Sequence, residues 1–245
     1  QIASPFEEQM VRECRGIVLD QDDGWRVVSR AFDKFFNHGE ALASQIDWNT
    51  AAVQEKIDGS LSVIYAYDGM WQVATSGTPD ASGDVHGNGK TFNDYFWETF
   101  DANTDELPAL DCGMCFYFEL TGPLNRIVVP HAEASVTLLG ARDLRTQLEI
   151  PVRLAERLFL PGVATVKQYD LSDLDAIHKT FDSISPLEQE GYVVVDERFR
   201  RIKIKHPKYV ELHHAKDGLS RKAFVNIARR GESCEVTAHF PEFKP

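Results

Sequence analysis

The sequence has few cysteines and no long apolar run. Only 4 of the 245 residues are cysteine, too few to hold a chain of this size together by disulfides. No stretch approaches the roughly 20 consecutive apolar residues that cross a bilayer, and no secretory signal sequence is recognisable. A disulfide scaffold and a helical membrane protein are therefore excluded. The expected location is cytoplasmic, which for a viral protein is the cytoplasm of the host.

Two of the cysteines, Cys112 and Cys115, have the C-x-x-C spacing of a zinc-ligand or redox pair. A structural zinc site needs a second pair of ligands, and no partner pair is apparent in the sequence. Cys115 also begins a strand-like apolar run. Reduced cysteines within the core are the favoured interpretation.

A phosphate-binding loop of the Walker type is also lacking. The glycine-rich segment 77–91 ends in Gly89-Lys90-Thr91, but the position six residues before Lys90 is Asp84. Gly83 lies one position too early, and no strand comes directly before the segment. The spacing therefore excludes a P-loop.

Positive charge is scarce overall, since the formal net charge is −12. That balance argues against a nucleic-acid partner, but the charge is unevenly distributed. Residues 198–230 hold 11 Lys and Arg against two acidic residues, which leaves this segment at +9 and the remainder at −21. A local basic face suits a phosphate-bearing partner. A solvated basic helix face accounts for the charge equally well.

Alternating apolar patterns and turn signals predict an α+β fold. Mainly antiparallel β-sheets flanked by helices are expected, with a nucleotide cleft between the sheets. The predicted strands are 17–20, 25–29, 61–67, 70–75, 116–120, 136–141, 190–196 and 201–205. The predicted helices are 92–100, 148–160 and 172–181. Residues 1–206 are expected to form one domain, and residues 207–245 a short basic helical C-terminal extension.

The stretch Gln54–Leu61 places Lys56 two residues before Asp58-Gly59. Asp-Gly is a strong hairpin signal, so an ordinary turn is the simplest interpretation. An acidic residue and a glycine so close to a lysine also suit a nucleophile that meets a phosphate. The stretch alone does not decide between the two.

Other charged residues lie on predicted strands far from Lys56 in the sequence. Glu119 ends an aromatic strand, and Glu190 opens the last hairpin. Alternation in the second arm of that hairpin directs Arg201, Lys203 and Lys205 to one side. Like charges repeated on one strand face cost stability unless an anion is bound there.

Together these motifs resemble those of the covalent nucleotidyltransferase superfamily, which includes ATP-dependent RNA and DNA ligases and mRNA capping enzymes. The order and spacing of four segments carry the resemblance: 56–60, 116–119, 190–193 and 203–205. Three flanking segments are similar to the bacteriophage tRNA-repair type of RNA ligase: 14–16, 29–37 and 123–128. The resemblance spans roughly residues 11–209, and the joint pattern is more specific than any single motif.

The resemblance implies an adenylyltransferase domain in which Lys56 is the catalytic nucleophile. Lys56 would attack the α-phosphorus of ATP, release pyrophosphate and hold AMP as a lysyl phosphoramidate. The implied ATP- and AMP-binding residues are Arg15, Lys34, Phe36, Glu55, Asp58, Gly59, Glu119, Glu190, Lys203 and Lys205. Glu119 and Glu190 would also hold hydrated Mg²⁺, or Mn²⁺ in its place, through water. Lys203, Lys205 and a bound magnesium ion are expected to lower the pKa of Lys56 by placing positive charge nearby.

The implied partner is RNA with 5′-phosphate and 3′-hydroxyl ends. AMP would pass to the 5′-phosphate, and attack by a 3′-hydroxyl would form the phosphodiester and release AMP, as in RNA repair. A monomer without membrane association is expected. Ser76 departs from the family, which has a lysine before Gly77, and only 40 residues follow Lys205. The preference among tRNA, other single-stranded RNA and nicked duplex therefore stays open.

Two other functions remain as alternatives. A DNA ligase or a capping enzyme would add a C-terminal OB-fold barrel, and the 40 residues after Lys205 are too few and too helical for one. A non-catalytic nucleotide- or RNA-binding module of the same fold is the other alternative. Against it stands the presence of five residues: Lys56, Glu119, Glu190, Lys203 and Lys205.

Overall fold

The computed structural model describes residues 4–103 and 107–218. The chain divides into two compact units, residues 1–206 and 207–245. In the second unit, helix α5 covers Pro207–Gly218. The later part of the predicted basic extension, including Arg221 to Arg230, lies outside the described residues.

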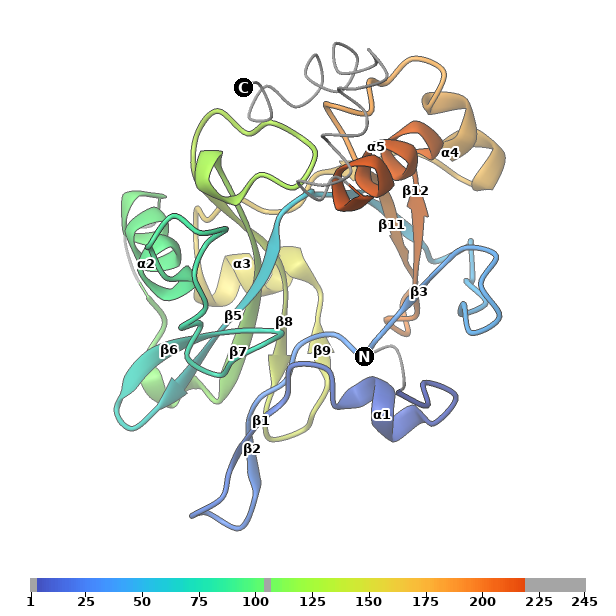
Figure 1. Ribbon diagram of the computed structural model, residues 1–245. Helices are drawn as coiled ribbons and strands as arrows, with labels where there is room; N and C mark the ends of the chain where they lie inside the picture. The colour runs from blue at the N-terminus through green and yellow to red at the C-terminus, as the bar shows by residue number, and fades with distance from the viewer. Residues whose placement is uncertain (1–3, 104–106, 219–245) are drawn as a thin grey trace. The chain divides into compact units, whose positions relative to one another are not determined.

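The first unit contains a five-stranded antiparallel sheet, here the first sheet (Figure 1). Its strand order is β6-β5-β7-β8-β9. The bounds are Ser60–Tyr67 for β5, Met70–Thr75 for β6, Met114–Thr121 for β7, Ser135–Asp143 for β8 and Glu149–Ile150 for β9. β5 and β6, which correspond to the predicted strands 61–67 and 70–75, form an antiparallel hairpin.

The second sheet also has five strands, in the order β10-β4-β11-β12-β3. The bounds are Phe36–Asn37 for β3, Ala52–Lys56 for β4, Gln168–Tyr169 for β10, Gly191–Val195 for β11 and Arg201–Lys205 for β12. Its pairs are antiparallel except β12 with β3. A separate hairpin joins β1 (Val18–Asp20) to β2 (Arg26–Ser29).

Strand β7 is buried on both faces, which explains its aromatic sequence. Phe116 and Phe118 belong to the core cluster that includes residues of helices α2 (Phe92–Asn103) and α3 (Val152–Phe159). Cys115 and Tyr117 belong to a different cluster on the opposite face. Successive side chains of β7 thus alternate between two cores. Cys112 and Cys115 are both free thiols, and no group of three metal-ligating side chains occurs among the described residues.

The second sheet packs its apolar face against helix α4 (Leu174–Thr180), with Ile177, Tyr192 and Ile204 in one core cluster. The helix predicted from residue 148 begins only at Val152. Residues 149–150 pair with β8 as β9, and Pro151 precedes the first helical residue. Long-range strand pairing thus overrides the helical pattern there.

Three short helices complete the described parts of the chain. They are α1 (Gln9–Glu13) and the 3₁₀ turns η1 (Leu110–Cys112) and η2 (Pro123–Asn125). No helix among the described residues has both the length and the apolar character needed to cross a membrane.

Candidate active site

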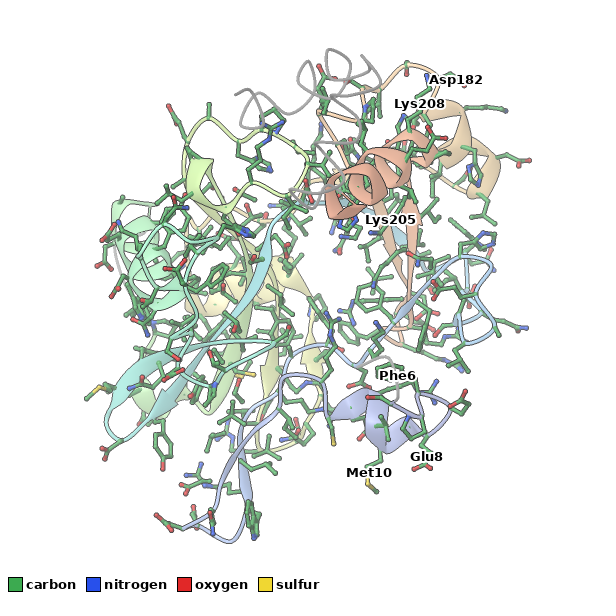
Figure 2. All side chains as sticks on the ribbon, viewed as in Figure 1. Phe6, Glu8, Met10, Asp182, Lys205 and Lys208 are labelled. Carbon is green, nitrogen blue, oxygen red and sulfur yellow. The ribbon has the colours of Figure 1, made fainter. Side chains whose placement is uncertain are left out.

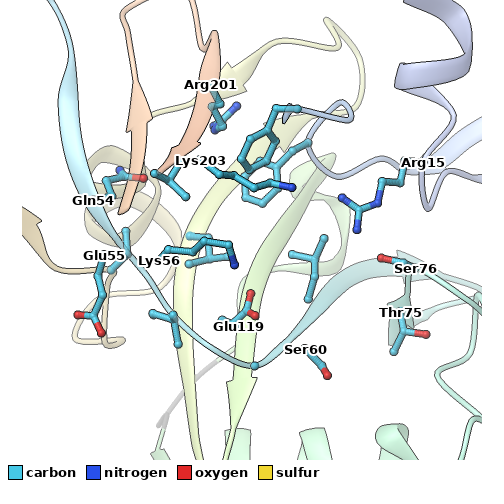
Figure 3. A pocket seen from close by; sticks show the side chains of 18 of the residues that line it. Arg15, Gln54, Glu55, Lys56, Ser60, Thr75, Ser76, Glu119, Arg201 and Lys203 are labelled. Atoms are coloured by element: carbon cyan, nitrogen blue, oxygen red, sulfur yellow. The ribbon is translucent and has the colours of Figure 1, made fainter. Parts of the chain in front are cut away.

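A cavity of about 390 Å³ lies beside the point where β4 leads into β5. Lys56, Glu119, Lys203 and Arg15 are among its lining residues. In Figure 3, Lys56 and Lys203 come from the second sheet, and the carboxylate of Glu119 lies close to the amine of Lys56. The cavity is therefore built from both sheets.

Lys56, Glu190 and Lys205 form a lysine–glutamate cluster at adjoining strand ends. Glu190 Oε2 lies 2.6 Å from Lys56 Nζ, and Glu190 Oε1 lies 2.8 Å from Lys205 Nζ. Gly191, next to Glu190, pairs with Lys56 of β4 on one side and with Lys205 of β12 on the other (Figure 2 labels Lys205). Strand register thus places one buried carboxylate between two lysines.

Gly191 is required where these strands meet. Its φ is +150°, and a Cβ there would lie 2.2 Å from the carbonyl oxygen of Ile204. No side chain fits at that distance. The glycine lets β11 approach β12 closely enough for Glu190 to reach both lysines.

The pKa of Lys56 is raised above its ordinary value. Burial alone would lower the pKa, but Glu190, Glu119 and Asp58 together outweigh it. The expectation that neighbouring cations lower this pKa is wrong for the protein alone, because three carboxylates act on the amine. Lys56 is therefore an ammonium group paired with Glu190.

Glu119 and Lys203 have strongly shifted pKa values at the same site. Loss of hydration raises the pKa of Glu119 to about 8, although Lys56 opposes the shift. Burial, followed by the charges of Lys56, Lys34 and Arg15, lowers the pKa of Lys203 to about 7. Groups with such displaced pKa values are typical of functional sites.

Arg15 lines the cavity, and its Nε atom is buried with no hydrogen-bond partner among the described residues. Lys34 does not line the cavity. Its Nζ lies 5.3 Å from the ring centre of Phe6 and 5.7 Å from that of Phe36, while Arg15 helps burial to lower its pKa. Lys34 and Phe36 thus form a separate cation–π group with Phe6, which Figure 2 labels.

Three phenylalanines line the cavity, Phe32, Phe35 and Phe92, whereas Phe36 is not among its lining residues. Phe36 lies on β3, where it pairs with Ile202. The segment 30–37 holds three phenylalanines without a regular period over most of its length. Sequence pattern therefore gave no signal for which ring faces the cavity.

Asp58 and Gly59 shape the chain around Lys56. The buried Asp58 carboxylate accepts hydrogen bonds from the backbone N–H groups of Val128 and Val129, at 2.8 and 2.7 Å. Gly59 lines the cavity, and a Cβ there would lie 2.4 Å from the carbonyl oxygen of Leu120. Asp58 thus ties the turn after Lys56 to the segment before β8, and Gly59 lets the turn lie close to β7 of the first sheet.

Glu55 and Ser76 also line the cavity. Burial raises the pKa of the Glu55 carboxyl, and Lys167 and His131 oppose that shift. Arg201 is a further lining residue, which the sequence placed on the same strand face as Lys203 but gave no role.

Glu119 and Glu190 supply the oxygen donors expected for a magnesium site. Mg²⁺ usually keeps several waters and is held by one or two carboxylates together with substrate phosphates. Both carboxylates act on Lys56 electrostatically, and no third metal-ligating side chain joins them among the described residues. The donor set fits a hydrated Mg²⁺.

The chain was compared with known protein families and curated proteins. A family model described as RNA ligase matches residues 13–209. An RNA ligase of Rhodothermus phage RM378 is 32% identical over 275 residues, which cover 87% of this chain and 63% of the relative. RNA ligase 1 of bacteriophage TS2126 is 31% identical over 205 residues, which cover 76% and 48%. The chain spans 36% to 63% of the length of the curated relatives it matches.

Among solved structures, an archaeal ATP-dependent RNA ligase shares the fold. The TM-score is 0.57 at 18% identity, over 82% of this chain and 55% of the archaeal chain. The predicted α+β architecture with mainly antiparallel sheets is confirmed.

Proposed function

The chain belongs to the RNA ligase family, and from this premise we propose that it is an ATP-dependent RNA ligase. It joins RNA 5′-phosphate and 3′-hydroxyl ends through a lysyl-AMP intermediate, as in RNA repair. The lysine–glutamate cluster carries the proposal, because it places a lysine amine in a cavity lined by Arg15 and Lys203. Residues 1–206 are the adenylyltransferase part, residues 207–245 are a short basic extension, and the basic segment from about Lys203 to Arg230 faces the RNA.

The first step is transfer of AMP from ATP to Lys56. The amine must first lose a proton, and Glu190 Oε2 lies 2.6 Å away as an acceptor. The neutral amine attacks the α-phosphorus, an N–P bond forms, and the P–O bond to pyrophosphate breaks as pyrophosphate leaves. Lys56 then carries AMP.

The cations around the cavity balance the phosphate charge in this step. Arg15 has a buried Nε without a hydrogen-bond partner among the described residues, and Lys203 regains its full charge when an anion approaches. Such preorganised charges stabilise a transition state in which negative charge moves to the leaving group. Mg²⁺, held by Glu119 and Glu190 through water, would supply further charge neutralisation.

Two transfers to RNA follow. An RNA 5′-phosphate oxygen attacks the phosphorus of lysyl-AMP, which breaks the N–P bond and leaves an adenylylated RNA end. A 3′-hydroxyl then attacks the RNA 5′-phosphorus, the phosphodiester forms, and AMP leaves. The protein acts as a monomer in the cytoplasm. Ser76 stands where the family has a lysine, so the cavity has one cation fewer.

Intact-mass measurement after incubation with ATP and Mg²⁺ tests the proposal. One added AMP is expected on the unaltered protein and on a Lys179→Ala control, and none on Lys56→Ala. Lys179 is an exposed lysine near the end of α4. No adduct on the unaltered protein would contradict the proposal and favour a non-catalytic module.

Two further arms separate the enzyme alternatives. An adduct formed with GTP instead of ATP would favour a capping enzyme. Sealing of nicked DNA but of no RNA would favour a DNA ligase. Parallel assays on broken tRNA, single-stranded RNA and nicked duplex RNA then identify the substrate.

A further inference from the structure

A buried ion-pair network joins the two sheets beside the cavity. Glu149 of β9, in the first sheet, accepts two hydrogen bonds from Arg201 of β12, in the second sheet. The Oε2–NH2 distance is 2.6 Å and the Oε1–NH1 distance is 3.0 Å. Arg142 of β8 also donates to Glu149 Oε1, at 3.1 Å. Arg142, Glu149 and Arg201 are called the inter-sheet network below.

Aromatic contacts extend the inter-sheet network toward the cavity. The Arg201 guanidinium lies 4.6 Å from the ring centre of Phe32. Phe32 packs edge-on against Tyr117 at 4.7 Å, and the Tyr117 hydroxyl accepts a hydrogen bond from Arg142 Nε at 3.2 Å. Together with the inter-sheet network, these contacts form a closed ring of side chains from both sheets and from the segment before β3.

The ring adjoins the groups proposed to handle the nucleotide. Arg201 and Phe32 line the cavity. Lys203 follows Arg201 by two residues, on the same face of β12, and its Nζ lies 4.7 Å from the ring centre of Phe35. Phe35 in turn contacts Phe32 at 6.1 Å. A displacement of Arg201 would therefore move Lys203 and also the rings of Phe32 and Phe35 beside the cavity.

The two sheets carry different halves of the proposed chemistry. Lys56 and Lys203 lie on the second sheet, and Glu119 lies on the first. The chain links the sheets directly at residues 57–59, between β4 and β5. Glu149 and Arg201 link them again through side chains, far from that linker in the sequence. The distance between Lys56 and Glu119 thus depends on both links.

Stability alone is a weak reason for such a network. Buried ion pairs lose much of their attraction to desolvation, and apolar replacements are often no less stable. The inter-sheet network also has an excess of positive charge, because the guanidinium groups of Arg142 and Arg201 share the single carboxylate of Glu149. The next carboxylate, that of the partly exposed Asp33, lies 3.7 Å from Arg142. Directional, bidentate pairing fixes geometry more tightly than apolar contact does.

We propose that Glu149 is a positioning residue for nucleotide transfer. It holds Arg201, and with Arg142 it sets the spacing of the two sheets at which Lys56, Lys203 and Glu119 meet around the phosphates. This inference rests on the proposed function. Glu149 does not line the cavity and contacts no reacting atom.

Single-turnover adenylylation of Lys56 tests this role, measured over a range of ATP concentrations in the full chain. Glu149→Gln keeps the size of the side chain but removes its charge. The rate at saturating ATP is expected to fall by about 10- to 100-fold, as for a misplacement of about 1 Å. The ATP concentration that gives half the maximal rate is expected to change little, because Arg15 is retained in the cavity.

The matched control is Asp196→Asn. Asp196 is also buried, and it pairs with Arg200 at 2.7 Å in the β11–β12 connection. This variant removes the charge of a buried carboxylate that pairs with a more exposed arginine and does not line the cavity. Both variants are assayed well below their measured melting temperatures, and Asp196→Asn is expected to keep the rate of the unaltered protein.

A double variant separates positioning from general damage. If Glu149 acts through Arg201, Glu149→Gln combined with Arg201→Gln is expected to be no slower than the slower single variant. A Glu149→Gln rate equal to that of the unaltered protein or of Asp196→Asn would overturn the inference and leave the proposed function intact. An unaltered protein that forms no AMP adduct would overturn both.

Discussion

At the scale of single residues, the surroundings of Lys56 show how the proposed nucleophile is held in the protein alone. Glu190 holds Lys56 at 2.6 Å and Lys205 at 2.8 Å. The raised pKa of Lys56 means that the amine is stored in its charged, unreactive form. Adenylylation would then require Lys56 to pass a proton to Glu190, its hydrogen-bond partner at 2.6 Å. Glu190 therefore helps to set the protonation state of Lys56.

Lys203 provides a residue-scale prediction about pH. Its pKa is about 7 in the folded protein and ~10.4 in an unfolded chain. Between these values the unfolded state binds more protons, so the contribution of Lys203 to stability rises with pH. Below pH 7 the charged side chain is destabilising, because it is buried among Lys56, Lys34 and Arg15. Lys203→Met is therefore expected to stabilise the protein at pH 6.5 and to have less effect at pH 9.5.

Thermal melting of Lys203→Met and unaltered protein across this pH range measures the effect. A gain of about 2 to 4 °C is expected for each kcal/mol recovered at low pH. Lys179→Met, at an exposed position of α4, is the control and should show no pH-dependent gain. A difference between variant and unaltered protein that grows toward pH 9.5 would contradict the assigned pKa direction.

At the scale of elements, the close approach of β11 to β12 allows the lysine–glutamate cluster to form. Gly191→Ala would place a Cβ 2.2 Å from the Ile204 carbonyl oxygen, with φ at +150°. Backbone strain and displacement of β12 are expected to cost more than about 3 kcal/mol of unfolding free energy. Denaturant unfolding measures this cost, and AMP adduct formation should fall with it.

Gly24 offers a matched control for that substitution. Its φ is +59°, but a Cβ added there would meet no atom within 4 Å. Gly24→Ala should therefore cost only about 1 kcal/mol, from left-handed backbone strain alone. Equal costs at the two positions would show that the contact with β12 is not the deciding factor.

Sequence pattern predicted the longer strands and the hairpins well, because alternation and turn residues are local signals. The strands β5, β6 and β12 lie where they were expected, within a residue. The two-residue strands β3, β9 and β10 were not predicted. Such short strands exist only through pairing with distant partners, so no local pattern marks them.

At the scale of the whole molecule, an acidic chain is proposed to bind an acidic polymer. The net charge is −12, yet the basic segment 198–230 carries +9. Electrostatic attraction must then be local to that segment and strongly dependent on salt. The part of the segment after residue 218 is known only as sequence, so its role stays a prediction.

Neutralising basic residues of the extension tests this role. The variant changes four residues to glutamine: Arg221, Lys222, Arg229 and Arg230. RNA affinity should fall, and the slope of log affinity against log salt should decrease by about 0.7 per lost phosphate contact. Formation of the AMP adduct should not change, because Lys56 and its cluster lie in the first unit.

A control variant neutralises as many basic residues on the first unit. These exposed positions are Arg145, Arg153, Arg157 and Lys179. Binding assays on single-stranded RNA should find the larger loss in the extension variant. Equal losses would mean that net charge, rather than the extension, governs RNA affinity.

The sequence by itself determined which residues are proposed to carry the chemistry and in what order they occur. Lys56, Glu119, Glu190 and Lys203 follow from motif order and strand alternation, which are local properties of the chain. Tertiary structure alone decided their relations, because partners and burial depend on which distant strands become neighbours. It placed Glu190 between two lysines, paired Arg201 with Glu149, which is 52 residues away, and raised the pKa of Lys56 where the sequence predicted a lowered one.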